Sequence, residues 1–124
     1  MPEVVTIGFL DAFVSAWNRH DTNAILEMMT SDCVLSLASG PSKEGSRFEG
    51  REAIRAAIGD LLARMPDVQW QNPRHFVSGD RGVTEWTMLA TTRDGRRIEA
   101  NGCDIFHFKD GRVAIKNSYR KFPA

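Results

Sequence analysis

Hydrophobic residues recur every three or four positions in two stretches of the chain, as on the buried face of a helix. The first stretch consists of Ile7, Leu10, Phe13, Val14 and Trp17. The second consists of Ile54, Ala57, Ile58, Leu61, Leu62 and Met65. We expect Gly50 to open this later helix and Pro66 to end it, because proline disrupts helical hydrogen bonding. Between the two, Asp21 is placed to cap a short helix around Leu26.

Beyond Pro66 the apolar residues alternate with polar ones, which is typical of strands. Four strands are predicted, over residues 68–78, 83–92, 96–108 and 113–122. Asp94-Gly95 and Asp110-Gly111 lie between these runs, and Asp-Gly between alternating stretches is a strong hairpin signal. A further short strand is predicted over 33–37, before a loop at 39–46. Three helices followed by an antiparallel meander predict an α+β layer arrangement, with a pocket between helices and sheet.

Composition limits the classes of function. The chain has 124 residues, which fits one domain over 1–124, and 16 basic residues balance 16 acidic ones. This balance argues against nucleic acid as the main partner. No apolar stretch approaches the ~20 residues of a membrane span, so we expect a cytoplasmic protein with no membrane contact. Cys33 and Cys103 are 70 positions apart and match no zinc or redox spacing, so no metal site and no cofactor are predicted.

Three segments carry a family resemblance: Ala16-Trp17-Asn18-Arg19-His20-Asp21, Phe48-Glu49-Gly50-Arg51-Glu52-Ala53-Ile54 and the run 104–113, which begins Asp104-Ile105-Phe106. With this order of elements, the chain resembles the NTF2-like superfamily, in its SnoaL-like and ketosteroid-isomerase-like branch. The resemblance covers nearly the whole chain. It implies a cone-shaped, curved antiparallel sheet wrapped around three helices, and a two-fold dimer formed through the sheet.

The same resemblance singles out Asp104 as a candidate catalytic residue. Ketosteroid isomerases carry, two residues ahead of an F-x-F pair, an Asp that donates a hydrogen bond to the developing enolate oxygen. Asp104 stands in that position ahead of Phe106 and Phe108. The other two isomerase residues are missing, because the tyrosine falls on Phe13 and the base falls on Leu37 or its neighbour Ser36. A standard ketosteroid isomerase is therefore not expected.

Alternation also makes Asp104 the lone charge of an apolar row, where it must be neutral or partnered. A two-residue turn at Asp94-Gly95 would set it opposite Glu85. A glycine bulge at Gly111 would set it opposite Lys116, and a plain turn would choose Asn117 instead. We favour Glu85, Asp104 and Lys116 as an acid–base group, with a satisfied ion pair of no catalytic role as the alternative.

The remaining predictions concern binding. The expected pocket-lining residues are Phe13, Trp17, Leu37, Trp86 and Phe106. Trp86 lines the pocket or faces a partner, depending on the hairpin register. The strand over 96–108 is apolar on both faces near its centre, with Cys103 and Ile105 on one of them. The face away from the helices is therefore expected to pack against a second copy of the chain.

Two functions remain open from the sequence. The first is a cofactor-independent enzyme that isomerises, cyclises or dehydrates a small hydrophobic carbonyl compound by moving a proton next to the carbonyl. In it Asp104 acts as base, or as a neutral hydrogen-bond donor, and Lys116 steadies negative charge. The second is a non-catalytic dimeric module for ligand binding or association.

Overall fold

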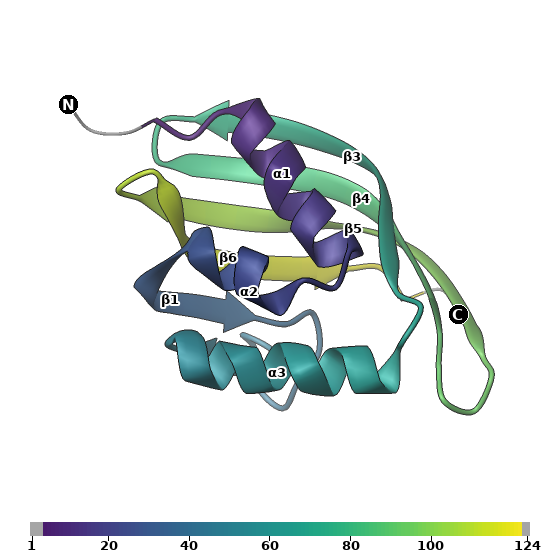
Figure 1. Ribbon diagram of the computed structural model, residues 1–124. Coiled ribbons are helices and arrows are strands. Elements are labelled where there is room, and N and C mark those ends of the chain that lie inside the picture. The colour runs from purple at the N-terminus through teal and green to yellow at the C-terminus, as the bar shows by residue number, and fades with distance from the viewer. Residues whose placement is uncertain (1–3, 123–124) are drawn as a thin grey trace.

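The computed structural model describes residues 4–122 as a curved sheet with helices on its concave side (Figure 1). The helices are α1 (Ile7–Asn18), α2 (Thr22–Glu27) and α3 (Arg51–Arg64). The strands are β1 (Met29–Ser36), β2 (Arg47–Glu49), β3 (Gln69–Ser78), β4 (Arg81–Thr91), β5 (Arg97–Lys109) and β6 (Arg112–Arg120). The predicted α+β class and the order of the three helices are confirmed. The short strand β2 falls outside the predicted elements.

The sheet has the strand order β2-β1-β6-β5-β4-β3. From β3 to β6 the chain forms the predicted antiparallel meander. The sheet is antiparallel, as expected, at every pair of neighbouring strands in the described chain except one, since β1 runs parallel to β6. Parallel neighbours need a long connection. Here the chain from β1 passes through β2, α3, β3, β4 and β5 before β6 lies beside it.

Local sequence signals set the helix ends as expected. The Asp21 carboxylate accepts a hydrogen bond from the backbone N of Ala24 at 3.1 Å and so caps α2. Gly50 occupies the N-cap of α3 with φ of 83°, a value that favours glycine. The helix ends at Arg64, with Met65 as its C-cap and Pro66 directly after it.

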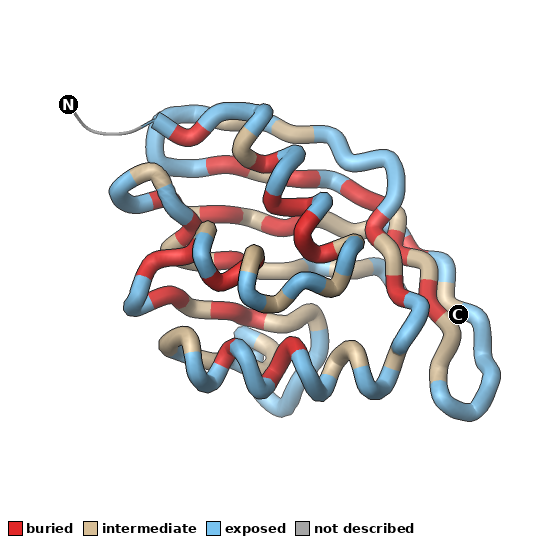
Figure 2. Tube along the Cα trace, in the orientation of Figure 1, coloured by how far each residue is buried: buried red, intermediate tan, exposed pale blue. Residues whose placement is uncertain are grey.

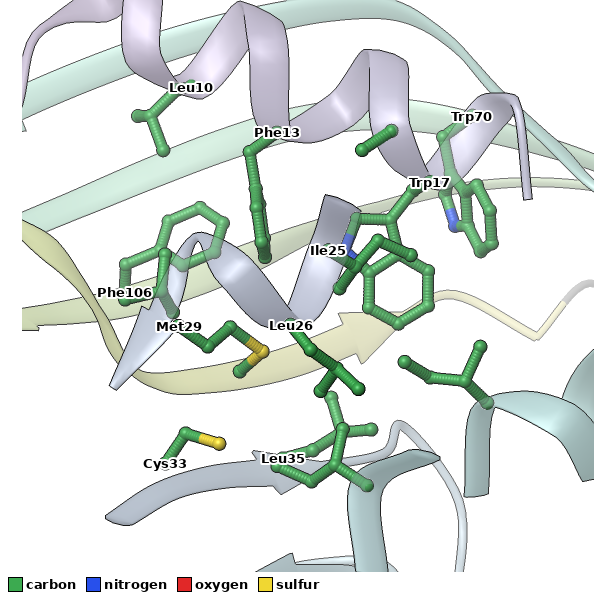
Figure 3. Close-up of a cluster of buried hydrophobic side chains, with 14 of the residues drawn as sticks. Leu10, Phe13, Trp17, Ile25, Leu26, Met29, Cys33, Leu35, Trp70 and Phe106 are labelled. Atoms are coloured by element: carbon green, nitrogen blue, oxygen red, sulfur yellow. The ribbon is translucent and has the colours of Figure 1, made fainter. Parts of the chain in front are cut away.

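The core lies between α1, α2, α3 and the concave face of the sheet, where the buried positions gather (Figure 2). Phe13 of α1 packs edge-on against Phe106 of β5, with ring centroids 5.9 Å apart (Figure 3). Phe106 is completely buried and stacks on Phe108. Aromatic pairs of this kind add to the stabilisation that burial of their surface provides. The concave face is thus filled at its centre, and a cavity lies toward one end.

The β4–β5 hairpin differs from the predicted register by one residue. Its loop contains three residues, Arg93 to Gly95, because Thr91 pairs with Arg97 and the Thr92 amide donates to the Arg96 carbonyl. Gly95 takes the left-handed conformation with φ of 84°, as three-residue hairpin loops require. Thr84, and not Glu85, therefore lies opposite Asp104.

The β5–β6 register also differs from both alternatives considered above. Lys109 pairs with Arg112 across a two-residue turn, but the register shifts between His107 and Phe108. Ala114 is the extra residue of this bulge, since His107 pairs with Ile115 and Phe108 with Val113. As a result, the residue opposite Asp104 is Ser118, and neither Lys116 nor Asn117.

Candidate functional site

A cavity of about 530 Å³ opens at the end of the concave face that the core leaves unfilled. The C-terminal part of α3, the β4–β5 hairpin, the end of β6 and the segment after β1 enclose it. Its deepest wall is aromatic, built from Trp17, Trp70 and Trp86. Its sides are largely aliphatic or thioether side chains: Leu37, Leu61, Met65, Met88 and Ile98. The structure thus brings the predicted lining residues Trp17, Leu37 and Trp86 to one cavity.

A much smaller void of about 10 Å³ lies behind this cavity. Four residues line both spaces: Trp17, Trp70, Trp86 and Lys116. Phe13 and Asp104 line only the inner void. Phe106, which was expected to line the pocket, lines neither space, because it is packed between Phe13 and Phe108. Asp104 lies one layer deeper than the space a ligand can fill.

Asp104 accepts three hydrogen bonds or ion-pair contacts although it is almost fully buried. The Ser118 hydroxyl donates to its Oδ1 at 2.6 Å, and the Lys116 Nζ lies 3.2 Å from the same oxygen. The Trp86 indole Nε1 donates to Oδ2 at 3.0 Å. Both oxygens of Asp104 therefore have donors, which is what a buried carboxyl group in an apolar row requires.

Lys116 connects Asp104 with the cavity. Its Nζ also donates to the Ser118 Oγ at 3.1 Å and lies 4.5 Å from the centroid of the Trp17 ring. An ammonium over an indole face gains a further electrostatic attraction, strongest where water is excluded. Lys116 and Ser118 both line the cavity and both contact the Asp104 carboxylate. A ligand in the cavity can therefore interact with Asp104 indirectly, through these two side chains.

Glu85 does not belong to this group. Because the hairpin is shifted by one residue, its side chain lies on the convex face of the sheet and is exposed. The same shift turns Trp86 inward, which settles the alternative that the sequence left open for this residue. The predicted trio of charges is therefore a pair, completed by a hydroxyl and an indole.

Sequence reasoning missed Ser118 and Arg120 as cavity residues. Both follow Lys116 at intervals of two along β6, so alternation from Lys116 would have found them once that residue was placed inward. Trp70 was missed because its inward position depends on a distant contact. The Asn18 side-chain Nδ2 donates to the backbone carbonyl of Trp70 at 3.0 Å, and the Asn18 Oδ1 accepts a hydrogen bond from the backbone N of Trp70 at 2.7 Å.

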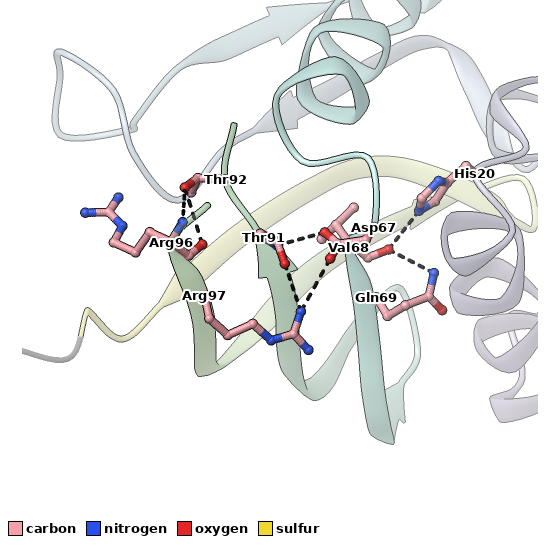
Figure 4. Close-up of polar contacts among 8 residues, drawn as sticks. All are labelled: His20, Asp67, Val68, Gln69, Thr91, Thr92, Arg96 and Arg97. Atoms are coloured by element: carbon pink, nitrogen blue, oxygen red, sulfur yellow. Dashed lines mark hydrogen bonds and ion pairs between the residues drawn. The ribbon is translucent and has the colours of Figure 1, made fainter. Parts of the chain in front are cut away.

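The β4–β5 hairpin is held against the start of β3 by polar contacts (Figure 4). Asp67 accepts a hydrogen bond from the Thr91 amide at 2.7 Å, and Arg97 reaches the same carboxylate at 3.4 Å. The hydrogen bonds from Thr91 hold the pKa of Asp67 below its usual value. His20 contacts the Val68 carbonyl at 2.7 Å, which ties the α1–α2 turn to the same strand. The two contacts of Asp67 fix the hairpin wall of the cavity.

A second histidine contact lies away from the cavity. The His75 side chain is 3% exposed, and its Nε2 lies 2.7 Å from the Asp11 carboxylate while its Nδ1 lies 2.8 Å from the Thr84 hydroxyl. The sequence did not reveal this His–Asp pair. Neither His75 nor Asp11 lines the two spaces described above, so we assign the pair to packing of α1 on the sheet.

Two findings concern other kinds of site within residues 4–122. No three His, Cys, Asp or Glu side chains there gather closely enough to bind a metal ion. No helix in that part of the chain has the length and apolar character needed to cross a bilayer.

A family model gives the chain its relatives. The model of the SnoaL-like domain matches residues 10–115. The chain belongs to this family. The match runs from α1 to the first part of β6 and ends one residue before Lys116. None of the functionally curated proteins matches the chain.

Solved structures agree on the fold. A candidate polyketide cyclase from Xanthomonas campestris has a TM-score of 0.80 at 21% identity, with 90% of this chain and 87% of that one covered. A protein from Catenulispora acidiphila with a ketosteroid isomerase-like fold, solved in complex with trimethylamine, has a TM-score of 0.81 at 16% identity, with 93% and 86% covered. A candidate isomerase from Bacillus subtilis has a TM-score of 0.76 at 19% identity, with 92% and 84% covered. At these identities the likeness establishes the NTF2-like fold alone.

Proposed function

We propose that this SnoaL-like protein is a cofactor-independent enzyme that moves a proton next to the carbonyl of a small, hydrophobic compound. The observation that carries the proposal is the buried Asp104–Lys116 pair at the inner end of an aromatic cavity. A carboxylate and an ammonium held together out of water, with a cavity beside them, form the kind of environment that acid–base catalysis uses. Names of similar structures, a candidate polyketide cyclase and a candidate isomerase, are compatible with such chemistry.

In the proposed reaction Ser118 carries the proton between substrate and Asp104. The Ser118 Oγ takes a proton from the carbon next to the carbonyl as its own proton passes to Oδ1 of Asp104, 2.6 Å away. The electron pair of the broken C–H bond moves to the carbonyl oxygen, which becomes an enolate. Lys116, which also lines the cavity, stabilises that negative charge. Return of the proton to a different carbon gives the isomer and restores Ser118 and Asp104.

This assignment revises the role expected for Asp104 from the family resemblance. The residue does not line the main cavity, so direct contact with substrate is replaced by contact through Ser118. Phe13 has no hydroxyl, so it cannot take the place of the isomerase tyrosine. In the proposed reaction Lys116 stabilises the developing oxyanion instead. Both residues needed for the proton path come from neighbouring positions on β5 and β6.

The second candidate function is a non-catalytic module that binds an apolar ligand. It is favoured by one observation: both oxygens of Asp104 already have donors within the protein. A fully satisfied buried pair can exist for structural reasons alone. Under this alternative the cavity binds its ligand unchanged.

Hydrogen–deuterium exchange distinguishes the two functions without knowledge of the natural substrate. Small cyclic ketones and enones are incubated with the protein in D2O, and exchange next to the carbonyl is followed by NMR. We expect the protein to accelerate exchange. Asp104→Asn should reduce this acceleration by about 10²- to 10⁴-fold, the range typical for loss of a general base. Ser118→Ala should slow it as well, since the relay loses its hydroxyl.

Glu85→Gln is the matched control, because it removes a carboxylate from the neighbouring strand on the opposite face of the sheet. Its exchange rate should equal that of the unchanged protein. Full exchange activity in Asp104→Asn contradicts the assignment of Asp104. Binding of the ketones without any accelerated exchange supports the non-catalytic alternative.

A further inference from the structure

Positive charge is concentrated around the cavity although the chain as a whole is neutral. Five cationic side chains line it: Arg64, Arg93, Arg96, Lys116 and Arg120. Asp94 is the single carboxylate among the lining residues, and its side chain is bound to the Thr92 hydroxyl. A concave surface with one sign of charge and low-dielectric walls attracts ligands of the opposite sign.

Most of these cations have partners within the protein. Arg64 pairs with Asp60 at 3.1 Å, and the Nε of Arg93 donates to the Ala63 carbonyl at 3.2 Å. Lys116 is neutralised by Asp104. Among the described residues 4–122, no carboxylate lies within ion-pair distance of Arg93, Arg96 or Arg120. Arg93 and Arg96 are exposed to water, whereas Arg120 is partly buried.

Arg120 is also desolvated. Its Nε is buried without a hydrogen-bond partner, and its Nη1 finds only the Met88 sulfur at 3.9 Å. The Phe122 ring covers the guanidinium with its centroid 4.2 Å from Cζ. Burial lowers the pKa of Arg120, but a guanidinium stays charged at neutral pH. The protein therefore keeps a partly buried, unpaired cation facing an apolar cavity, and such a group is costly until an anion reaches it.

The position of Arg120 relates it to the proposed reaction centre. Lys116, Ser118 and Arg120 alternate along β6 and all line the cavity. Two residues of a strand span roughly 7 Å, so Arg120 lies about that far along the strand from Ser118. An anionic group bound by Arg120 would therefore be separated by a few bonds from a carbonyl at Lys116 and Ser118.

We propose that the cavity binds a hydrophobic carboxylate, whose anionic group pairs with Arg120 and whose apolar body packs on Trp17, Trp70 and Trp86. Together with the proposed function, on which this step rests, it gives the substrate class as an apolar keto acid. Guanidinium and carboxylate form paired, parallel hydrogen bonds, and these are stronger than hydrogen bonds between neutral groups. The aromatic wall accounts for the hydrophobic part of the ligand.

Calorimetric titration with a matched pair of probes, 2-naphthoate and 2-naphthamide, tests this inference. The two molecules share their ring system and differ in charge. We expect the unchanged protein to bind the naphthoate at least about tenfold more tightly, since hydrogen bonds between a guanidinium and a carboxylate are stronger than those between neutral groups. Arg120→Gln should abolish the difference between the probes, and Arg120→Lys should retain part of it.

Arg81→Gln is the control variant, because it removes the same charge from an exposed position at the start of β4 that does not line the cavity. It should keep the full preference for naphthoate. Equal affinity for both probes, a preference that survives in Arg120→Gln, or failure of naphthoate to bind at millimolar concentration would overturn the inference.

The proposed function is separated from this result by Asp104→Asn. That variant should lose accelerated exchange but keep the preference for naphthoate, because the contacts of Arg120 are with Met88 and Phe122 and do not involve Asp104. A charge preference without any exchange activity would leave the carboxylate site in place and refute the catalytic proposal alone. Accelerated exchange of neutral ketones without a preference for naphthoate would support the catalytic proposal and refute the carboxylate site alone.

Discussion

The Oδ1 of Asp104 lies 3.2 Å from the Nζ of Lys116, and neither side chain is more than 8% exposed. The two residues are not directly opposite one another, since Lys116 pairs with Phe106 and Asp104 with Ser118. The long lysine side chain reaches diagonally between these neighbouring pairs, above the Trp17 ring. Two charges in this setting depend on each other, because either one alone would be buried without compensation.

The first prediction concerns this dependence. Asp104→Leu alone should destabilise the protein by about 3–5 kcal/mol, since it leaves the Lys116 ammonium without a counter-charge. Lys116→Met alone should destabilise it for the corresponding reason. The double variant Asp104→Leu/Lys116→Met should recover most of the loss, because hydrophobic residues replace the pair as a unit. Urea denaturation of all four proteins at pH 7 gives the coupling; a double variant as unstable as the sum of the single variants would contradict it.

Gly102 provides a test of how tightly Trp86 is held. A Cβ at this position would lie 2.5 Å from the Trp86 ring and 2.4 Å from the Tyr119 carbonyl oxygen. Gly102→Ala should therefore cost about 1–3 kcal/mol and displace the indole that donates to Asp104. Near-ultraviolet circular dichroism and urea denaturation report the two effects.

Gly59→Ala is the control for this substitution. Gly59 lies within α3, and a Cβ there would meet no atom within 4 Å. Alanine should stabilise the helix by about 0.5–1 kcal/mol, because glycine loses more backbone freedom on folding. If Gly102→Ala were equally stabilising, close packing of Trp86 over Gly102 would be refuted.

The sequence predicted the helices and strands far better than the register between the strands. Helical spacing and alternation located α1, α3 and the meander, because burial of one face imposes those periods. Alignment across a hairpin depends on loop length, and Asp94-Gly95 fits both a two-residue turn and a three-residue loop with glycine in the left-handed conformation. A shift by one residue exchanges the two faces, which moved Glu85 outward and Trp86 inward.

The site was predicted in part for the same physical reason. Asp104 and Lys116 remained together because an even shift along a strand preserves the face. The bulge at Ala114 carries no sequence signal, so the sequence could not place Ser118 opposite Asp104. Trp70 enters the cavity through its contact with Asn18, which is 52 positions away and invisible to any local pattern.

Acid should weaken the anchor between β3 and the β4–β5 hairpin. The pKa of Asp67 is lowered in the folded protein, mainly by the hydrogen bonds from Thr91. A lowered carboxyl pKa contributes stability that is fully present above the unfolded value of about 3.9 and is lost as pH falls through the folded pKa. Asp67→Asn should therefore be less stable than the unchanged protein at pH 7.

Denaturation measured between pH 7 and pH 2 checks this prediction. The difference between the two proteins should shrink below about pH 4 and vanish once Asp67 is protonated in the folded state. Asp60→Asn is the control, since Asp60 is an exposed carboxylate paired with Arg64 on the surface of α3. A pH-independent difference for Asp67→Asn would show that its carboxylate charge contributes nothing to the anchor.

The last prediction concerns the convex face of the sheet, which none of the three described helices covers (Figure 1). Half-buried apolar residues lie side by side there, since Val83 pairs with Ile105, and Cys103 pairs with the exposed Tyr119. We expect this face to bind a second copy of the chain in a two-fold arrangement, in which the same patch of both copies forms the contact.

Ile105→Lys should then give a monomer, because it places a charge at the centre of the contact. Light scattering coupled to size exclusion measures the mass. Ile7→Lys, the same change at a position on α1 that is 52% exposed, should leave the dimer intact. The prediction is contradicted if the unchanged protein is a monomer, or if the dimer survives Ile105→Lys.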